Sequence, residues 1–228
     1  KYFIFRLMKE NKKTALILGA TGLTGGILLQ FLLQNEAYEK VKIFSRSSIG
    51  FTHPKIEEYV INLFQLEEFK SKFTGDEVYC CVGTTKNKTP NNEVYKDIDY
   101  GIPLKAAQLA KENGINTILI ISALGANSKS SIFYNRIKGE MESDVLKLKI
   151  ENTYILQPSL IGGNRVEKRF GEQIFKQIMK IFSFVLVGPL DKYKTIEPST
   201  IAKAMIWLAN NSYKEARIAS NEIKKLAH

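Results

Sequence analysis

The stretch GATGLTGG, residues 19–26, lies between the apolar run TALIL and the helical pattern ILLQFLLQ. Its glycines recur at every third position, so a turn from a buried strand into a helix is left nearly free of side chains. The open amides and positive potential of a helix N-terminus then suit an anion such as a pyrophosphate. The pattern G-x-x-x-x-G-K-[ST] of triphosphate-binding loops is not found, and the context favours a dinucleotide. The predicted contacts in this turn are Gly19, Thr21, Gly22, Leu23, Thr24 and Gly25.

Beyond this turn, short apolar runs alternate with longer helical stretches. Strands are expected at residues 14–20, 41–46, 57–63, 76–85, 116–123 and 152–163. Helices are expected at residues 25–34, 64–72 and 102–114. Strands that alternate with helices indicate a parallel sheet, so the predicted fold is α/β, a Rossmann-type doubly wound parallel sheet with a small C-terminal lobe.

The alternation also sets the expected domain organisation. We expect an N-terminal extension at 1–13, an NAD(P)-binding Rossmann domain at 14–163, and a substrate-side lobe at 164–228 integrated into the same domain. Helices of this lobe are expected to cap the carboxyl edge of the sheet. Met8 is the expected natural start, with residues 1–7 an added extension.

Composition restricts the classes of partner. The chain has 228 residues and a net charge of +10, but no lysine run exceeds two residues, which argues against nucleic-acid binding. A basic surface suits a phosphorylated cofactor equally well. No apolar run approaches the ~20 residues that cross a bilayer, so no transmembrane segment is expected.

The cysteines and histidines are few. Cys80 and Cys81 are adjacent in an apolar run and do not form a disulfide framework, which fits a reducing, cytoplasmic location. With only His53 and His228 besides, no metal site is expected.

The end of the second strand bears on the choice of cofactor. An acidic residue about 20 positions past the glycines binds the ribose of NAD, but here the strand ends in Ser45-Arg46-Ser47-Ser48. Arg46 can pair with a 2′-phosphate and stack on adenine, and Ser47 can donate a hydrogen bond. We therefore predict NADPH/NADP as the cofactor, with NAD less favoured.

Three residues form the predicted catalytic group. Ser122 ends the fifth strand, and Tyr134 and Lys138 lie one turn apart on a helix beginning near Ser130. A free tyrosine has a pKa near ~10, and a lysine one turn away stabilises its phenolate. Tyr134 is the expected acid/base. Lys138 is expected to lower the pKa of the Tyr134 phenol and to contact the ribose of the cofactor. Ser122 is expected to polarise a substrate carbonyl.

A second Y-x-x-x-K pair, Tyr38 and Lys42, shows that the motif alone is weak evidence. This pair is expected in the loop into the second strand, at the amino-terminal edge of the sheet. Ligands bind at the carboxyl edge, so we assign no chemistry to it.

Taken together, these motifs resemble the short-chain dehydrogenase/reductase superfamily. The motifs are GATGLTGG, Ser-Arg after the second strand, CVGTT at 81–85 and S-x11-Y-x3-K. They look most like its atypical NAD(P)-binding branch related to Tat-interacting protein, which is similar to nucleoside-diphosphate-sugar epimerases. The likeness runs from about Thr14 to Met205.

The resemblance implies further site residues. Cofactor contacts are implied at Asn62, Leu63, Val82, Gly83, Thr84, Thr85, Pro158, Ser159 and Leu160. The substrate side is implied at Arg165 and Arg169. The helical Asn of the superfamily's usual catalytic tetrad is replaced around Asp97 to Asp99.

Three functional readings follow. The leading one is an NADPH-dependent oxidoreductase that reduces a small carbonyl or oxidises an alcohol. The alternatives are a sugar-nucleotide epimerase, or a cofactor-binding regulator with little turnover. For the regulator, the apolar stretch at 178–190 would form a partner-facing or membrane-facing surface, although burial in the core of the lobe or a role as a substrate lid is favoured for it. A homodimer or another protein partner is a further expectation.

Overall fold

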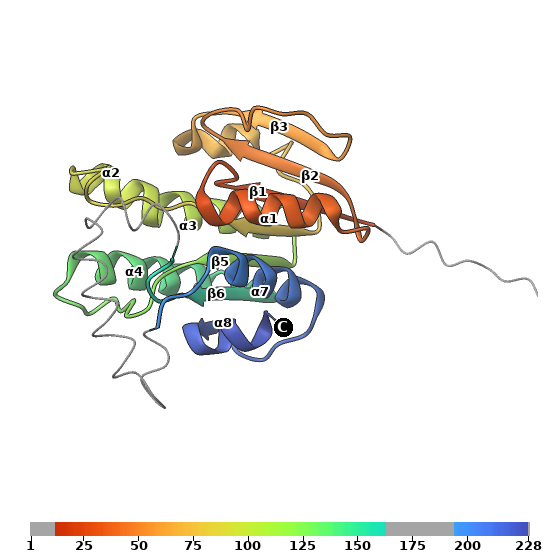
Figure 1. The fold of residues 1–228 in the computed structure, drawn as a ribbon. Helices are drawn as coiled ribbons and strands as arrows, with labels where there is room; N and C mark the ends of the chain where they lie inside the picture. The colour runs from red at the N-terminus through yellow and green to blue at the C-terminus, as the bar shows by residue number, and fades with distance from the viewer. Residues whose placement is uncertain (1–11, 163–193, 228) are drawn as a thin grey trace, which may run out of the picture.

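The computed structural model describes residues 12–162 and 194–227. Seven strands form one parallel sheet in the order β3-β2-β1-β4-β5-β6-β7 (Figure 1). Their bounds are Lys13–Leu18 (β1), Tyr38–Ser45 (β2), Ile56–Val60 (β3), Glu77–Cys80 (β4), Thr117–Ile121 (β5), Asn152–Gln157 (β6) and Arg217–Ala219 (β7). The strand order reverses between β1 and β4, and ligand crevices form outside the carboxyl ends of strands at such a point.

Helices cover both faces of this sheet. Their bounds are Leu23–Gln34 (α1), Leu63–Phe69 (η1, a 3-10 helix), Asn92–Lys96 (α2), Asp97–Gly101 (η2), Ile102–Glu112 (α3), Phe133–Lys147 (α4), Pro198–Asn210 (α7) and Ser220–Leu226 (α8). The first core cluster joins α1, α7 and α8 to one face, and the second joins η1, α3 and α4 to the other. The predicted fold class, a doubly wound parallel α/β sheet, is confirmed.

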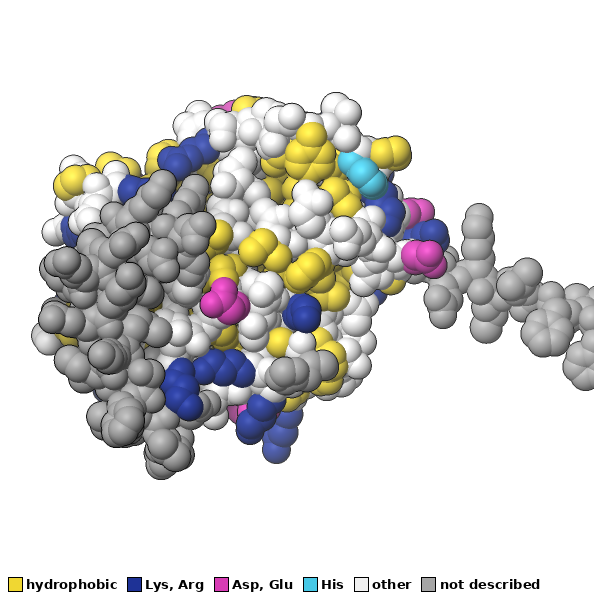
Figure 2. Space-filling model, viewed as in Figure 1, with side chains coloured by type: hydrophobic (Ala, Val, Ile, Leu, Met, Phe, Trp, Pro, Cys, Tyr) yellow, Lys and Arg dark blue, Asp and Glu magenta, His cyan; other side chains and the backbone are white. Residues whose placement is uncertain are grey.

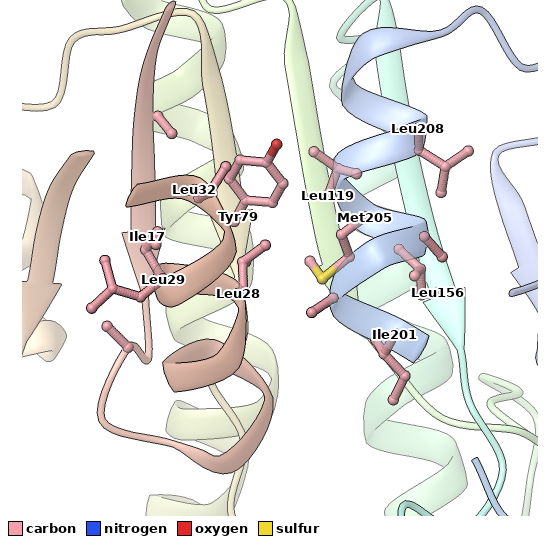
Figure 3. Packing of buried hydrophobic residues seen from close by; sticks show 14 of the residues in the cluster. Ile17, Leu28, Leu29, Leu32, Tyr79, Leu119, Leu156, Ile201, Met205 and Leu208 are labelled. Atoms are coloured by element: carbon pink, nitrogen blue, oxygen red, sulfur yellow. The ribbon is translucent and has the colours of Figure 1, made fainter. Parts of the chain in front are cut away.

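The strand β1 shows why the sheet is buried on both faces. Successive side chains of a strand point to opposite faces. Ile17 packs under α1 and Leu16 packs in the cluster with α3, and both are fully buried. Figure 3 shows Leu28 and Leu32 of α1 beside Ile17, and helix α7 beyond them along the same face. Truncating such a core leucine to alanine typically costs about 2–5 kcal/mol.

The C-terminal segment joins the sheet in a way that the sequence did not indicate. We expected its helices to cap the carboxyl edge, but α7 packs beside α1 on the sheet face and β7 extends the sheet beside β6. Helix α7 carries Ile201, Met205 and Leu208 at helical spacing, and this stripe needs an apolar face to cover. Strand β7 has only three residues, too few for a period-two pattern. The boundary predicted at residue 163 lies outside the described residues and stays a prediction.

The helix expected at 102–114 is the last part of a longer helical stretch. Asn91 caps α2 by accepting hydrogen bonds from the amides of Glu93 and Val94. The π-helical segment η2 then leads into α3, with the amide of Ile102 bonded to the carbonyl of Asp97. Pro103 has no amide to donate to residue 99, and we attribute the wider π register before it to this loss.

Positive charge is scattered over the described residues on the face that Figure 2 shows. On the face shown in Figure 2, the Lys and Arg side chains lie in separate groups among uncharged atoms. Several lysines among the described residues are held by carboxylates, for example Lys70 by Glu112 and Lys40 by Glu57. This distribution differs from the continuous basic stripe typical of nucleic-acid-binding surfaces.

Candidate active site

A cleft of about 860 Å³ lies at the carboxyl ends of β1, β4, β5 and β6. It is lined by Gly22, Leu23, Thr24, Cys81, Val82, Gly83, Thr84, Thr85, Lys88, Asp99, Ile121, Ser122, Ala123, Leu124, Gly125, Tyr134, Asn135, Lys138, Pro158, Ser159, Leu160 and Ile161. The glycine turn, the predicted catalytic group and the segment after β6 therefore share one cavity.

The N-terminus of α1 opens onto this cleft. Its N-cap is Gly22, which offers no side-chain cap, and the first turn contains no acidic residue. The amide of Gly26 bonds the carbonyl of Gly22, so the amides of Leu23, Thr24 and Gly25 precede the first intrahelical bond. A helix end of this kind has the donors and the positive potential that a phosphate group requires.

Two glycines of the turn are required by close backbone approach. Gly19 has φ +88°, and a Cβ there would lie 2.9 Å from the carbonyl carbon of Cys81. A Cβ on Gly25 would lie 2.2 Å from the carbonyl oxygen of Gly19. Any side chain at either position would push α1 away from the sheet and deform the turn.

Tyr134 lies in the first turn of α4 and lines the cleft. Its side chain is 38% exposed, and its ring packs edge-on against Tyr95 with centroids 6.5 Å apart. Desolvation raises the pKa of the Tyr134 phenol, the Lys138 ammonium lowers it and the Asp99 carboxylate raises it, with a net upward direction. The phenol therefore holds its proton at neutral pH.

Lys138 is buried one turn further along α4 and forms an ion pair. Its Nζ lies 2.8 Å from Oδ1 of Asp99, and the two side chains are 4% and 2% exposed. Although desolvation alone would lower the pKa of Lys138, the Asp99 carboxylate raises it, and the net direction is upward. The ammonium is thus retained in a site that is nearly closed to solvent.

Ser122 follows β5 and is buried among polar groups of α4 and β6. Its Oγ donates to Oε1 of Glu142 over 2.5 Å. Glu142 also accepts from Nε2 of Gln157 and from Nε of Arg217 in β7. A hydroxyl has a single proton to donate, so in this arrangement Ser122 cannot also donate to a substrate carbonyl. The donor role predicted from the sequence requires this bond to break.

Not all predicted residues reach the cleft. Gly19, Thr21 and Gly25 shape the turn without lining the cavity. Arg46 and Ser47 are exposed after β2, and the Arg46 guanidinium makes no ion pair or hydrogen bond within residues 12–162 and 194–227. The Asn62 side chain caps η1 by accepting from the amide of Phe64, and Leu63 packs against the core. Arg165, Arg169 and the stretch at 178–190 lie outside the described residues.

The sequence reasoning missed two acids. The motifs point to Asp99 only through the changed tetrad position, and they do not point to Glu142. Glu142 lies four residues after Lys138 and eight after Tyr134 on α4, and this spacing is the signal that would have found it. The hydrogen bond between Glu142 and Ser122 joins residues 20 positions apart, so no local pattern in the sequence indicates it.

The second Y-x-x-x-K pair has no catalytic surroundings. Tyr38 begins β2, where its hydroxyl lies 3.1 Å from that of Tyr79 and accepts from the amide of Asn210. Lys42 donates to the carbonyl of Lys72 and the hydroxyl of Thr74 instead. Tyr38 lies in the strand and not in the loop that the sequence suggested, still at the amino-terminal edge.

No family model matches the sequence. The chain is 32% identical to Protein HTATIP2 of Rattus norvegicus over 173 residues, which cover 74% of this chain and 71% of the rat protein. It is 35% identical to Protein FMP52, mitochondrial, of Candida glabrata over 181 residues, 75% of each chain. The chain belongs to the HTATIP2/FMP52 family. This confirms the predicted membership of the atypical short-chain dehydrogenase/reductase branch.

Solved structures support the fold of this family member. UDP-glucose 4-epimerase of Thermotoga maritima superposes with a TM-score of 0.67 at 15% identity, over 93% of this chain and 80% of that one. A short-chain dehydrogenase family protein of Francisella tularensis gives 0.66 at 14% identity, over 92% and 98%. Identities this low establish a shared fold.

The relatives also correct one prediction. The cytoplasmic location expected from the free cysteines is wrong, because the FMP52 proteins of Candida glabrata and Candida albicans are named mitochondrial. Cys80 and Cys81 are free thiols, but free thiols indicate a reducing environment and do not identify a compartment. None of the helices within 12–162 and 194–227 combines the length and hydropathy needed to cross a membrane.

Proposed function

We propose that this HTATIP2/FMP52 family member is an NAD(P)H-dependent oxidoreductase that interconverts a small carbonyl compound and its alcohol. One observation carries the proposal. The uncapped N-terminus of α1 and the Tyr134–Lys138 pair line the same cleft, so a phosphate-binding end and a proton donor serve one ligand.

The residues of the cleft fit a dinucleotide. The turn at Gly22 presents backbone amides without a competing carboxylate or cap, as a pyrophosphate needs. Val82, Gly83, Thr84 and Thr85 after β4 would lie along the ribose. Pro158, Ser159 and Leu160 after β6 would face the nicotinamide. Among solved structures of the same fold, Bordetella bronchiseptica WbmG is a complex with NAD.

A bound reduced nicotinamide supplies the hydride, and the side chains of this chain supply the proton and the charges. Tyr134 is protonated at neutral pH, and desolvation and Asp99 raise its pKa further, so its phenol would be the proton donor to the carbonyl oxygen of a substrate. The Lys138 ammonium stabilises the phenolate that remains. Ser122 keeps its proton on Oγ, in the hydrogen bond to Glu142, so Oγ can orient the phenol or an alcohol substrate only as a hydrogen-bond acceptor.

The preference for NADPH rests on Arg46 and Ser47. Arg46 is exposed and without a partner among the described residues at the end of β2, where the adenosine ribose lies in this fold. A free guanidinium there can pair with the 2′-phosphate of NADPH. Arg165 and Arg169 remain the proposed substrate-side residues on sequence grounds alone. From the names of the FMP52 relatives we also propose a mitochondrial location.

A second candidate function is a cofactor-binding regulator with little turnover. The observation that favours it is the pairing of both Ser122 and Lys138 with buried acids, which limits what each can offer a substrate. Such a protein would bind NADPH in the same cleft and change its affinity for another protein, without reducing carbonyls.

A titration followed by an assay tests these alternatives. We expect calorimetric titration to show saturable NADPH binding, tighter than NADH by about tenfold. Absorbance at the nicotinamide band is then followed with aldehydes, quinones and sugar nucleotides. Absence of binding by either cofactor overturns the proposal, and tighter binding of NADH overturns the NADPH preference. Binding without turnover on any substrate favours the regulator.

A further inference from the structure

The ion pair between Asp99 and Lys138 joins two elements far apart in sequence. Lys138 comes from α4, while Asp99 comes from the π-helical segment η2. The N–O distance is 2.8 Å, and both side chains are almost fully buried. Removing one partner of a buried pair leaves an uncompensated charge, so the two groups depend on each other.

Asp99 also holds the loop that follows β4. Its Oδ2 accepts from the amide of Thr84 over 2.8 Å, while Oδ1 faces Lys138. Thr84 lines the cleft, and its hydroxyl bonds that of Thr89. One carboxylate therefore fixes both the loop of the cleft wall and the catalytic lysine relative to each other.

The remaining contacts of Lys138 define where its free donor points. An ammonium has three N–H donors. Asp99 accepts one of them, and the carbonyl of Ile121 accepts a second in a long bond of 3.5 Å. Within the parts of the chain that the structure describes, no third acceptor contacts Lys138, and the residue lines the cleft.

From this geometry we infer that Asp99 is a positioning residue for Lys138: it anchors the ammonium on the cleft floor and directs its third N–H toward a bound ligand. The inference rests on the proposed function only where it predicts how Asp99 affects turnover. The anchoring itself is a property of the protein without cofactor. The resemblance puts the changed tetrad position around Asp97 to Asp99, and of these residues Asp99 is the one that contacts Lys138.

The electrostatic consequence concerns both residues of the catalytic pair. The titratable groups facing Lys138 are Asp99 from η2, Tyr134 from α4 and Cys80 from β4, while β5 contributes the Ile121 carbonyl. Desolvation lowers the pKa of Lys138, and the charge of Asp99 offsets most of this effect. Asp99 also raises the pKa of Tyr134, so it offsets part of the effect of the ammonium on the phenol.

The variant Asp99→Asn separates charge from shape. It keeps an oxygen for the Thr84 amide and removes the countercharge of a buried lysine. The pKa of Lys138 should then fall below its ordinary value of about 10.4, because the carboxylate that offsets most of the desolvation is gone. Because carbonyl reduction requires the ammonium form of Lys138, the alkaline limb of kcat/KM then moves to lower pH.

The deciding measurement is an NMR titration of 13Cε-labelled lysine in the protein without cofactor, with the Lys138 signal assigned from Lys138→Met. In the unsubstituted protein, we expect this signal not to titrate below pH ~10. In Asp99→Asn we expect a midpoint lower by at least about one unit. Asp99→Ser also removes the charge but leaves room for water. The Lys138 midpoint is measured in this variant if Asp99→Asn does not fold.

Glu77→Gln is the matched control. Glu77 is a carboxylate in β4, 1% exposed, that pairs with Lys13 at 3.1 Å on the opposite edge of the sheet. Its neutralisation should lower stability without moving either the Lys138 signal or the alkaline limb. An unchanged Lys138 midpoint in the Asp99 variants overturns the inference. Absence of turnover in the unsubstituted protein overturns the proposed function instead. The Lys138 midpoint measured by NMR then still decides whether Asp99 positions Lys138.

Discussion

Ser122 donates its hydroxyl proton to Glu142 over 2.5 Å, in a site where both side chains are at most 4% exposed. Arg217 of the C-terminal strand β7 bonds the same carboxylate at 2.7 Å. The serine of the predicted catalytic group is therefore part of a network that ties β5, α4 and β7 together. Its contribution to stability and its contribution to chemistry can be measured separately.

Replacing Ser122 by alanine should affect stability more than turnover. Glu142 loses one donor and keeps Gln157 and Arg217, so we expect a loss of about 1–2 kcal/mol in the free energy of unfolding. Because the hydroxyl proton is already engaged, kcat/KM should fall by less than about tenfold. Denaturant unfolding and steady-state kinetics measure the two effects, with Ser122→Thr as the variant that keeps the hydroxyl. A loss of turnover as large as that of a general acid would show that Ser122 gives up Glu142 to the substrate.

Replacing Tyr134 by phenylalanine removes the proposed proton donor and little else. The ring contact with Tyr95 is retained, so the free energy of unfolding and NADPH affinity should stay close to the original values. Turnover should fall on the order of 10²–10⁴-fold, the usual contribution of a general acid.

The chain offers its own control in Tyr38→Phe. That hydroxyl bonds Tyr79 and Asn210 at the far edge of the sheet. Its loss should cost about 1 kcal/mol of stability and leave turnover unchanged. Equal turnover in Tyr134→Phe and Tyr38→Phe would remove Tyr134 from the mechanism.

Adjacent glycines of the turn should respond differently to alanine. A Cβ at Gly25 meets the Gly19 carbonyl oxygen at 2.2 Å, whereas one at Gly26 meets the Ala20 oxygen at 3.3 Å. Gly25→Ala must displace backbone, so we expect a loss of about 2–4 kcal/mol in unfolding free energy and weaker NADPH binding. Gly26→Ala should stay within about 1 kcal/mol, because the gain in helix propensity offsets a small adjustment. Thermal unfolding and calorimetric titration of NADPH measure both variants. Equal stability and equal NADPH affinity of the two would contradict the close backbone approach at Gly25.

Replacing Arg46 by alanine should change cofactor preference without changing the fold. The side chain is exposed and makes no hydrogen bond or ion pair with a described residue. A charge-assisted bond to the 2′-phosphate contributes about 1.5–3 kcal/mol, so NADPH affinity should fall roughly 10- to 100-fold. NADH, which lacks the phosphate, serves as the internal control and should bind nearly as before. A parallel weakening of both cofactors would mean that Arg46 acts through the shape of the β2 loop.

Local patterns accounted for much of this fold because they coincide with what the sheet requires. The buried run of β1, the glycine turn and the stripe of α1 each carry a signal within a few neighbouring residues. The same holds for Tyr134 and Lys138, whose separation is one helical turn. By contrast, β7 and the start of β2 at Tyr38 carry weak local signals, and their strand state comes from neighbours elsewhere in the chain.

The sequence by itself determined the parallel α/β class, the position of the glycine turn and the candidate pair Tyr134–Lys138, because period and spacing are encoded over short distances. Only the tertiary structure decided the partners of the buried polar groups. Asp99 reaches Lys138 across 39 positions (138 − 99) and Arg217 reaches Glu142 across 75 (217 − 142). A buried charge must find a countercharge wherever the fold brings one close, and that proximity is a property of the assembled sheet and helices, not of any segment.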